Sequence, residues 1–148
     1  MFNVSLVVRE CSGCVVIGLH GELDIADAAD VAAALAAAAA GRTEIVVDLA
    51  GLMFIDCSGV RALARARARH EGGVMLLAAP RRVVLRVLAM TGLIDVSDVC
   101  VTVEDAIDVA DRARRGRGGL PGHTKRGLPA EELRDGGRVG DPGLHVVY

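Results

Sequence analysis

The chain has 148 residues, 52% of them hydrophobic and 24% charged, a composition typical of a globular domain with a modest extension. Aromatic residues make up only 2%, which argues against a stacking surface for single-stranded nucleic acid. The net charge of −2 combines −5 over residues 1–113 (10 Lys and Arg against 15 Asp and Glu) with +3 over 114–148 (7 against 4). An acidic domain of this kind does not resemble a duplex-DNA binder, which concentrates cations.

Targeting and membrane signals are not evident in the sequence. Arg9 and Glu10 interrupt the first apolar run, and no basic segment precedes it as in a secretory signal. The longest apolar stretch, 31–40, is mostly alanine and falls short of the about 20 residues that a membrane span needs. Four cysteines in a chain of this size do not suggest a disulfide framework. We therefore expect a cytoplasmic protein that does not insert into a membrane.

The first elements in chain order are two strands. Residues 3–9 alternate and are rich in valine, which predicts a strand. Residues 10–13 have turn chemistry, and 15–19 predict a second strand. We expect the two strands to pair as a hairpin.

A helix and a buried strand come next. Asp24 or Asp27 can cap a helix over 28–40, and Gly41 can end it. Residues 44–49 form a continuous apolar run, typical of a strand buried on both faces.

The second half of the chain alternates helices with strands. Helices are predicted over 60–69, over 81–90 and from Thr102 to about Ala113, and strands over 74–78 and 99–101. This order predicts an α/β fold, a mixed β-sheet packed with α-helices, over residues 1–113. Residues 114–148 are rich in Gly, Pro and Arg, and we expect a disordered C-terminal tail because so few apolar residues cannot repay the entropy of ordering.

The segment Phe54–Gly59, between the buried strand and the following helix, carries the residue of most interest. Ser58 is expected at or just before the first turn, where its hydroxyl can cap free backbone N–H groups. A phosphate is tolerated at a helix start, and on Ser58 it would place a charge of about −1.5 to −2 close to Asp56. Gly59 would let a partner approach closely. On this local pattern alone, Ser58 is equally an ordinary helix cap.

Four segments in the same order resemble the STAS domain family, and within it the anti-sigma factor antagonists. Residues 48–59 look like the phosphorylation-site region of those proteins, and Gly21–Asp24 resembles the turn after their second strand. Residues 88–93 resemble the end of their third helix, and 103–106 the opening of their last helix. The resemblance covers residues 4–112 and implies a STAS-type fold.

The resemblance also implies a mechanism. An anti-sigma factor, which is a serine kinase, would bind the unphosphorylated chain and release its sigma factor. Phosphorylation of Ser58 would break that complex, and a phosphatase would restore it. Ser58 is then a substrate and not a catalyst. No nucleophile–base pair or metal-ligand set can be assembled from the spacing of the residues, so we do not expect an enzyme, a cofactor or a metal site.

The partner surface is expected to include five residues around this site: Asp24, Asp56, Cys57, Gly59 and Arg61. The family usually has Ser or Thr where this chain has Cys57. Arg61, Arg65 and Arg69 recur every four residues, either as a solvated helix face or as a basic stripe that faces an acidic or nucleotide-bearing partner.

Two alternatives stay open at this point. The first is a regulator switched by oxidation of Cys57, or of Cys11 and Cys14. Cys57 near a helix start could have a lowered thiol pKa, although a small buried side chain is the simpler interpretation. Cys11 and Cys14 form a C-x-x-C pair, but in a turn between strands and without two further zinc ligands nearby. The second alternative is a STAS subunit of a transport or sensory complex that does not act on a sigma-factor kinase.

Overall fold

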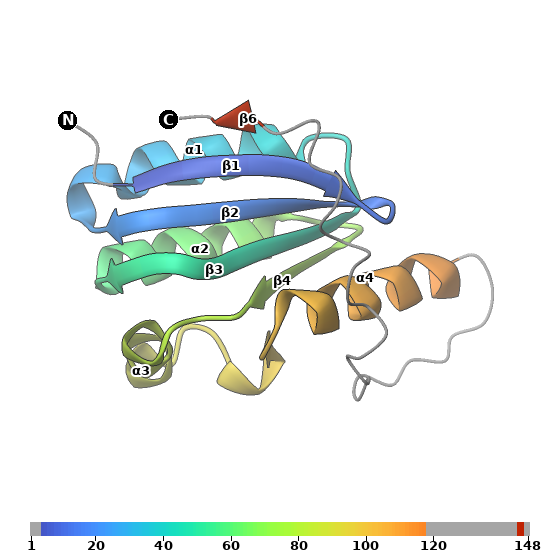
Figure 1. The fold of residues 1–148 in the computed structure, drawn as a ribbon. Coiled ribbons are helices and arrows are strands. Elements are labelled where there is room, and N and C mark those ends of the chain that lie inside the picture. Colours follow the sequence, from blue (N-terminus) through green and yellow to red (C-terminus); the bar gives the residue numbers. More distant parts are fainter. Residues whose placement is uncertain (1–3, 118–144, 147–148) are drawn as a thin grey trace.

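The computed structural model describes residues 4–117 and 145–146 (Figure 1). Its strands are β1 (Val4–Cys11), β2 (Cys14–Leu23), β3 (Glu44–Ile55), β4 (Val74–Ala78), β5 (Val99–Cys100) and β6 (His145–Val146). Its helices are α1 (Ile25–Ala39), α2 (Cys57–Arg69), α3 (Arg82–Thr91) and α4 (Val103–Arg117), with a short 3-10 turn, η1 (Val96–Asp98), before β5. The α/β fold predicted from the sequence is therefore confirmed.

The six strands form one mixed sheet in the order β5-β4-β3-β2-β1-β6. β1 and β2 are the predicted antiparallel hairpin, whereas β2, β3, β4 and β5 run parallel to one another. Because β2 and β3 are parallel neighbours, their carboxyl ends reach the same edge of the sheet, where Leu23 is paired with Ile55. α1 and α2 begin directly beyond that edge (Figure 1).

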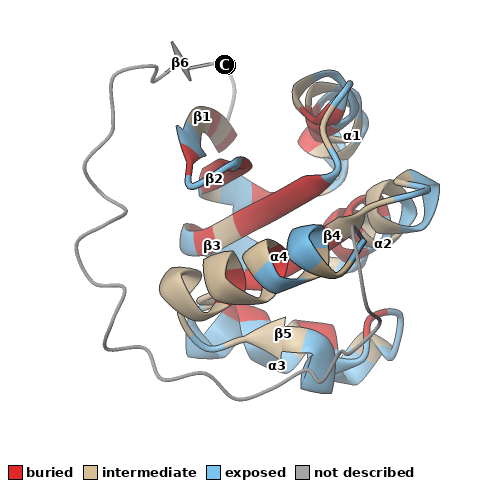
Figure 2. Cartoon of the chain, turned by 90° about the vertical axis from the view of Figure 1, so that its right-hand side faces the viewer, coloured by how far each residue is buried: buried red, intermediate tan, exposed pale blue. Residues whose placement is uncertain are grey.

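Helices cover both faces of the sheet. α1, α2 and α3 pack on one face over a cluster of Val, Leu and Ile side chains, and α4 packs on the other through Ala106 and Ala110. Figure 2 shows the buried residues concentrated on the strands and on the inner sides of the helices. The core is aliphatic, as the scarcity of aromatic residues predicts, and Phe54 is exposed.

β3 is longer than predicted, since it continues from Leu49 to Ile55. Beyond Asp48 it leaves β4 and pairs with β2 alone, with register shifts at Gly18/His20 and Gly21/Glu22. The ring of His20 lies against Gly51, where any Cβ would collide with it. The Ala50-Gly51 pair therefore marks a close contact within a continuing strand, although from the sequence it resembles a strand end.

α4 also extends further than predicted, to Arg117 instead of about Ala113, so the expected boundary at 113/114 falls inside a helix. Arg114 and Arg115 both pair with Asp111 one turn earlier, and Arg117 pairs with the buried Glu44. Positively charged side chains in the last turn of a helix also interact favourably with the helix dipole. Of the predicted tail, residues 118–144 and 147–148 lie outside the described residues, and β6 pairs antiparallel with β1 at Val7 and Val8. None of the helices in residues 4–117 combines the length and the apolar character that a membrane crossing requires.

Candidate functional site

Two aspartates stand at the edge where β2 and β3 end together. Asp24 follows Leu23 and caps α1, accepting a hydrogen bond from the Ala26 N–H at 3.0 Å. Asp56 follows Ile55 and caps α2, accepting from the Gly59 N–H at 3.0 Å. The capping role expected for Asp24 is confirmed. Asp24 and Asp56 each directly follow one member of the last β2–β3 residue pair, so both carboxylates lie at the same edge of the sheet.

Ser58 is the second residue of α2, after Cys57. The expected position of Ser58 at the first turn of a helix is confirmed, but the expected capping by its hydroxyl is wrong. Asp56, with extended backbone angles of φ −114° and ψ −175°, is the cap, because the chain turns into the helix one residue later. The Ser58 side chain is half-buried, and within the described residues its hydroxyl makes no hydrogen bond. It is therefore not committed to holding the helix.

The environment of Ser58 suits an anionic group in one respect and opposes it in another. The first N–H groups of a helix lack intrahelical acceptors and carry partial positive charge, so a phosphate on Ser58 would not unfold α2. The Asp56 carboxylate already accepts the hydrogen bond of the Gly59 N–H, however, and it lies only two residues before Ser58. Added negative charge would thus stay on the surface and strengthen an already acidic edge.

Gly59 is buried, contrary to its expected role as a point of close approach for a partner. A Cβ on Gly59 would lie 2.7 Å from Ile55 Cγ1, 2.8 Å from Leu23 Cγ and 2.9 Å from the Leu23 carbonyl oxygen. Glycine is required here so that the first turn of α2 can rest on the ends of β2 and β3. The residue contributes to the site by setting the position of Ser58.

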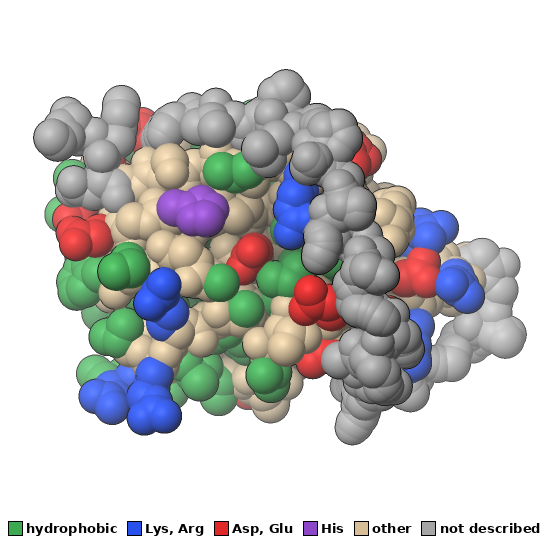
Figure 3. Space-filling model, in the orientation of Figure 1, with side chains coloured by type: hydrophobic (Ala, Val, Ile, Leu, Met, Phe, Trp, Pro, Cys, Tyr) green, Lys and Arg blue, Asp and Glu red, His purple; other side chains and the backbone are tan. Residues whose placement is uncertain are grey.

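Large apolar side chains surround this edge. Ile25 is 75% exposed, Met53 53% and Phe54 44%, and all three lie at the carboxyl ends of β2 and β3 or directly after them. Figure 3 shows hydrophobic side chains gathered on the left-hand edge, where the arrows of β2 and β3 end in Figure 1. The apolar rim formed by Ile25, Met53 and Phe54 was not predicted, because exposed and buried positions look alike within the apolar run 52–55.

The cysteines differ sharply in their surroundings. Cys57 is exposed on the first turn of α2, so the expectation of a small buried side chain is wrong. Cys11 and Cys14 are buried, form no disulfide and lie opposite each other at the hairpin end, where the Cys14 thiol donates to the Cys11 carbonyl oxygen at 3.2 Å. Burial raises the pKa of the Cys14 thiol to about 12, which disfavours the reactive thiolate.

The three arginines spaced by four residues are all exposed on α2. Arg65 and Arg69 line a hollow of about 370 Å³ between α1 and α2. Arg61 stands one turn after Ser58, so the two side chains share a helix face. Of the predicted stripe, only Arg61 belongs to the same end of α2 as Ser58.

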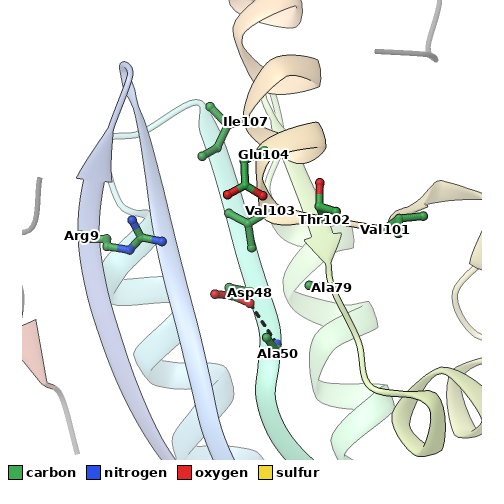
Figure 4. A pocket seen from close by; sticks show the side chains of 9 residues that line it. All are labelled: Arg9, Asp48, Ala50, Ala79, Val101, Thr102, Val103, Glu104 and Ile107. Carbon is green, nitrogen blue, oxygen red and sulfur yellow. Dashed lines mark hydrogen bonds between the residues drawn. The ribbon is translucent and has the colours of Figure 1, made fainter. Parts of the chain in front are cut away.

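A polar hollow of about 290 Å³ lies on the opposite face of the sheet, beside the start of α4 (Figure 4). Arg9, Asp48 and Glu104 point toward it. The Thr102 hydroxyl caps α4 by accepting from the Asp105 N–H at 3.0 Å, and Asp48 accepts from the Ala50 N–H at 2.9 Å. No three His, Cys, Asp or Glu side chains in residues 4–117 come together as metal ligands would. This hollow does not join the residues around Ser58.

Comparison with known proteins places this geometry in context. The model of the STAS domain family matches residues 5–106. No curated protein sequence matches the chain. Among solved structures, an anti-sigma factor antagonist from Mycobacterium paratuberculosis is 24% identical, with a TM-score of 0.65 over 72% of this chain and 93% of that one.

A second similar structure is the anti-sigma factor antagonist SpoIIAA in its unphosphorylated form. It is 28% identical, with a TM-score of 0.58 over 78% of this chain and 99% of SpoIIAA. The fold also recurs in the murine Solute Carrier 26 family member A9 anion transporter, at 17% identity and a TM-score of 0.62. There the match covers 76% of this chain but only 22% of the transporter.

Proposed function

Because the chain belongs to the STAS domain family, we propose that it is an anti-sigma factor antagonist whose partner surface is the edge around Ser58. It binds an anti-sigma factor that is a serine kinase, and so releases the sigma factor that the kinase holds. The similarity to SpoIIAA, at 28% identity over 99% of that protein, supports this role. Such a complex forms in the cytoplasm and needs no cofactor.

The observation that carries the proposal is the position of the Ser58 hydroxyl. It belongs to a side chain that is only half-buried, it has no hydrogen-bond partner among the described residues, and it lies on a helix start that Asp56 caps independently. A kinase can therefore modify Ser58 without dismantling the first turn of α2. The chain supplies the acceptor only, and the partner supplies the catalytic groups.

The apolar rim explains why phosphorylation would end the complex. Burial of Ile25, Met53 and Phe54 against a partner is favourable by roughly 25 cal/mol for each Å² of apolar area removed from water. A phosphate in the same contact brings a charge of about −1.5 to −2 that must be desolvated beside the Asp56 carboxylate. The modification thus weakens binding by local charge and desolvation and leaves the fold unchanged. A phosphatase that removes it restores the surface.

Binding to the anti-sigma kinases of the source organism tests the proposal. We expect Ser58→Ala to bind as the unmodified chain does, and Ser58→Glu to bind more weakly. Met53→Ser should also weaken binding because it removes part of the rim, whereas Met90→Ser, at a methionine that is 73% exposed on α3, serves as the matched control. Recovery of transporter or sensory subunits in place of a kinase would favour the alternative role as a STAS subunit of such a complex.

A further inference from the structure

The exposed large apolar side chains of the described residues fall into two groups. Three form the rim at Ser58, and the other six lie between residues 83 and 101: Val83, Leu85, Met90, Leu93, Val96 and Val101. The second group follows α3 and the segment from η1 to the start of α4. Contiguous apolar surface on a folded domain marks an interaction site. The proposed kinase surface does not account for this group.

Part of the second group lines an apolar groove of about 530 Å³ between α3 and β5. Leu85 and Ala89 of α3 form one wall, and Val96, Val99 and Val101 form the other. In Figure 2, β5 lies between α4 and α3 at the margin of the sheet. The groove is therefore at the β5 edge of the sheet, two strands away from β3, which carries the Ser58 segment.

Among the described residues that line the groove, the charged ones are two arginines, Arg82 and Arg86. They are four residues apart on α3 and thus lie on the same side of the helix. Neither guanidinium has an ion pair or hydrogen-bond partner within the described part of the chain. Residues 1–113 carry a net charge of −5, so this pair forms a local basic rim on an acidic domain.

The shape of the groove favours a helix over a strand as its occupant. Residues 82, 85, 86 and 89 follow the i, i+3, i+4, i+7 spacing with which one helix packs along another. β5 contributes only two residues to the sheet, so an added strand would gain few backbone hydrogen bonds. An amphipathic helix instead buries apolar side chains between two walls and leaves its flanks to the rim.

We propose that the groove between α3 and β5 binds an amphipathic helix of a partner protein, with acidic residues that pair with Arg82 and Arg86. The apolar stripe of that helix packs against Leu85 and Val101. This interface is separate from the Ser58 edge and does not depend on the role proposed there.

A titration of the full-length, isotope-labelled chain with two synthetic helical peptides tests the proposal. Both peptides carry the same leucine stripe, and their flanking residues are glutamate in one and lysine in the other. We expect the acidic peptide to bind at least tenfold more tightly and to shift the amide resonances of α3 and β5. Equal affinity of the two peptides, or shifts confined to α2 and the end of β3, would overturn the proposal.

Charge-reversed variants sharpen the test. Arg82→Glu with Arg86→Glu should reverse the preference between the peptides. The fold should be preserved because both side chains are exposed and an acidic residue at position 82 suits the first turn of α3. The matched control, Arg61→Glu with Arg65→Glu on α2, should leave the preference unchanged. If the unmodified chain forms a concentration-dependent dimer and the α3 double variant does not, the occupant of the groove is a second copy of the chain, and the proposal of a partner helix is wrong. If the double substitution Glu131→Lys with Glu132→Lys shifts the amide resonances of the groove without added peptide, the occupant is a segment of the chain itself, and the proposal of a partner helix is wrong.

Discussion

The backbone N–H of Asp56 donates a hydrogen bond to the carbonyl oxygen of Leu23 at 3.2 Å. This bond joins the last residue of β2 to the residue directly after β3 and fixes where α2 starts relative to α1. Two helix starts, each capped by an aspartate, consequently lie at one edge of the sheet, and Ser58 sits on the first turn of the second helix. The geometry of the proposed switch depends on this junction more than on Ser58 itself.

The packing of Gly59 against the strand ends predicts a destabilised Gly59→Ala variant. Its Cβ would approach Ile55 and Leu23 within 2.7 to 2.9 Å, and overpacking of this kind costs about 1–3 kcal/mol. Urea denaturation should show that loss in the free energy of unfolding. Gly116→Ala in α4 is the control, because no atom of the described residues lies within 4 Å of its Cβ and alanine favours helix by up to about 1 kcal/mol. Equal stability of the two variants would contradict the packing described.

Substitutions of Asp56 separate its structural role from its charge. Asp56→Ala removes the cap of α2 and should lower the free energy of unfolding by about 1 kcal/mol, whereas Asp56→Asn keeps an acceptor for the Gly59 N–H and should not. Thermal and urea unfolding measure both variants, with the exposed Asp30→Ala in α1 as the control. An Asn variant as unstable as the Ala variant would show that Asp56 is needed for more than capping.

The cysteines should differ in their reaction with iodoacetamide. Cys57 is exposed and should be alkylated in the folded protein at pH 8, whereas the buried Cys14 should be alkylated only after unfolding. Peptide mass spectrometry before and after addition of urea distinguishes the sites. If Cys14 is alkylated in the folded protein at a rate close to that of Cys57, Cys14 is not buried at the end of the hairpin as described.

The raised pKa of Cys14 makes stability depend on pH in the alkaline range. Burial lifts the thiol pKa from 9.0 to about 12, so the folded state holds this proton more tightly than the unfolded state. Its contribution is complete below pH 9 and declines as the pH rises toward 12, by at most about 1.4 kcal/mol per pH unit. Cys14→Val should flatten this decline in urea denaturation between pH 8 and 10.5. An identical slope for the variant would assign the effect to other groups.

Much of the fold could be predicted from the sequence because its strongest patterns are local. The runs at 44–49 and 74–78 are strands, Thr102 caps α4, and Gly92 ends α3 in a left-handed conformation. The extension of β3 could not be predicted, because it depends on His20 lying over Gly51, a contact between residues 31 positions apart. The end of α4 depends in the same way on Arg117 meeting Glu44.

The candidate site was proposed from the resemblance of residues 48–59 to a phosphorylation-site region, and the structure differs from the expected roles of several of its residues. Asp24 and Asp56 were expected at the partner surface from the resemblance, whereas the parallel pairing of β2 with β3, which brings them to one edge of the sheet, was not predicted. Capping by Asp56 in place of Ser58 depends on where the backbone turns into the helix, a matter of one residue. The burial of Gly59 and the exposure of Cys57 follow from that same turn, because the two residues face opposite sides of the first turn.

Phosphate transfer to Ser58 by an anti-sigma kinase of the source organism is the most direct test of the central claim. The full-length chain and Ser58→Ala are incubated with the kinase and labelled ATP, and phosphate incorporation is mapped by mass spectrometry. We predict that the unmodified chain is phosphorylated on Ser58 and that the variant remains unlabelled. Labelling of Ser58→Ala to the same extent as the unmodified chain would contradict the account.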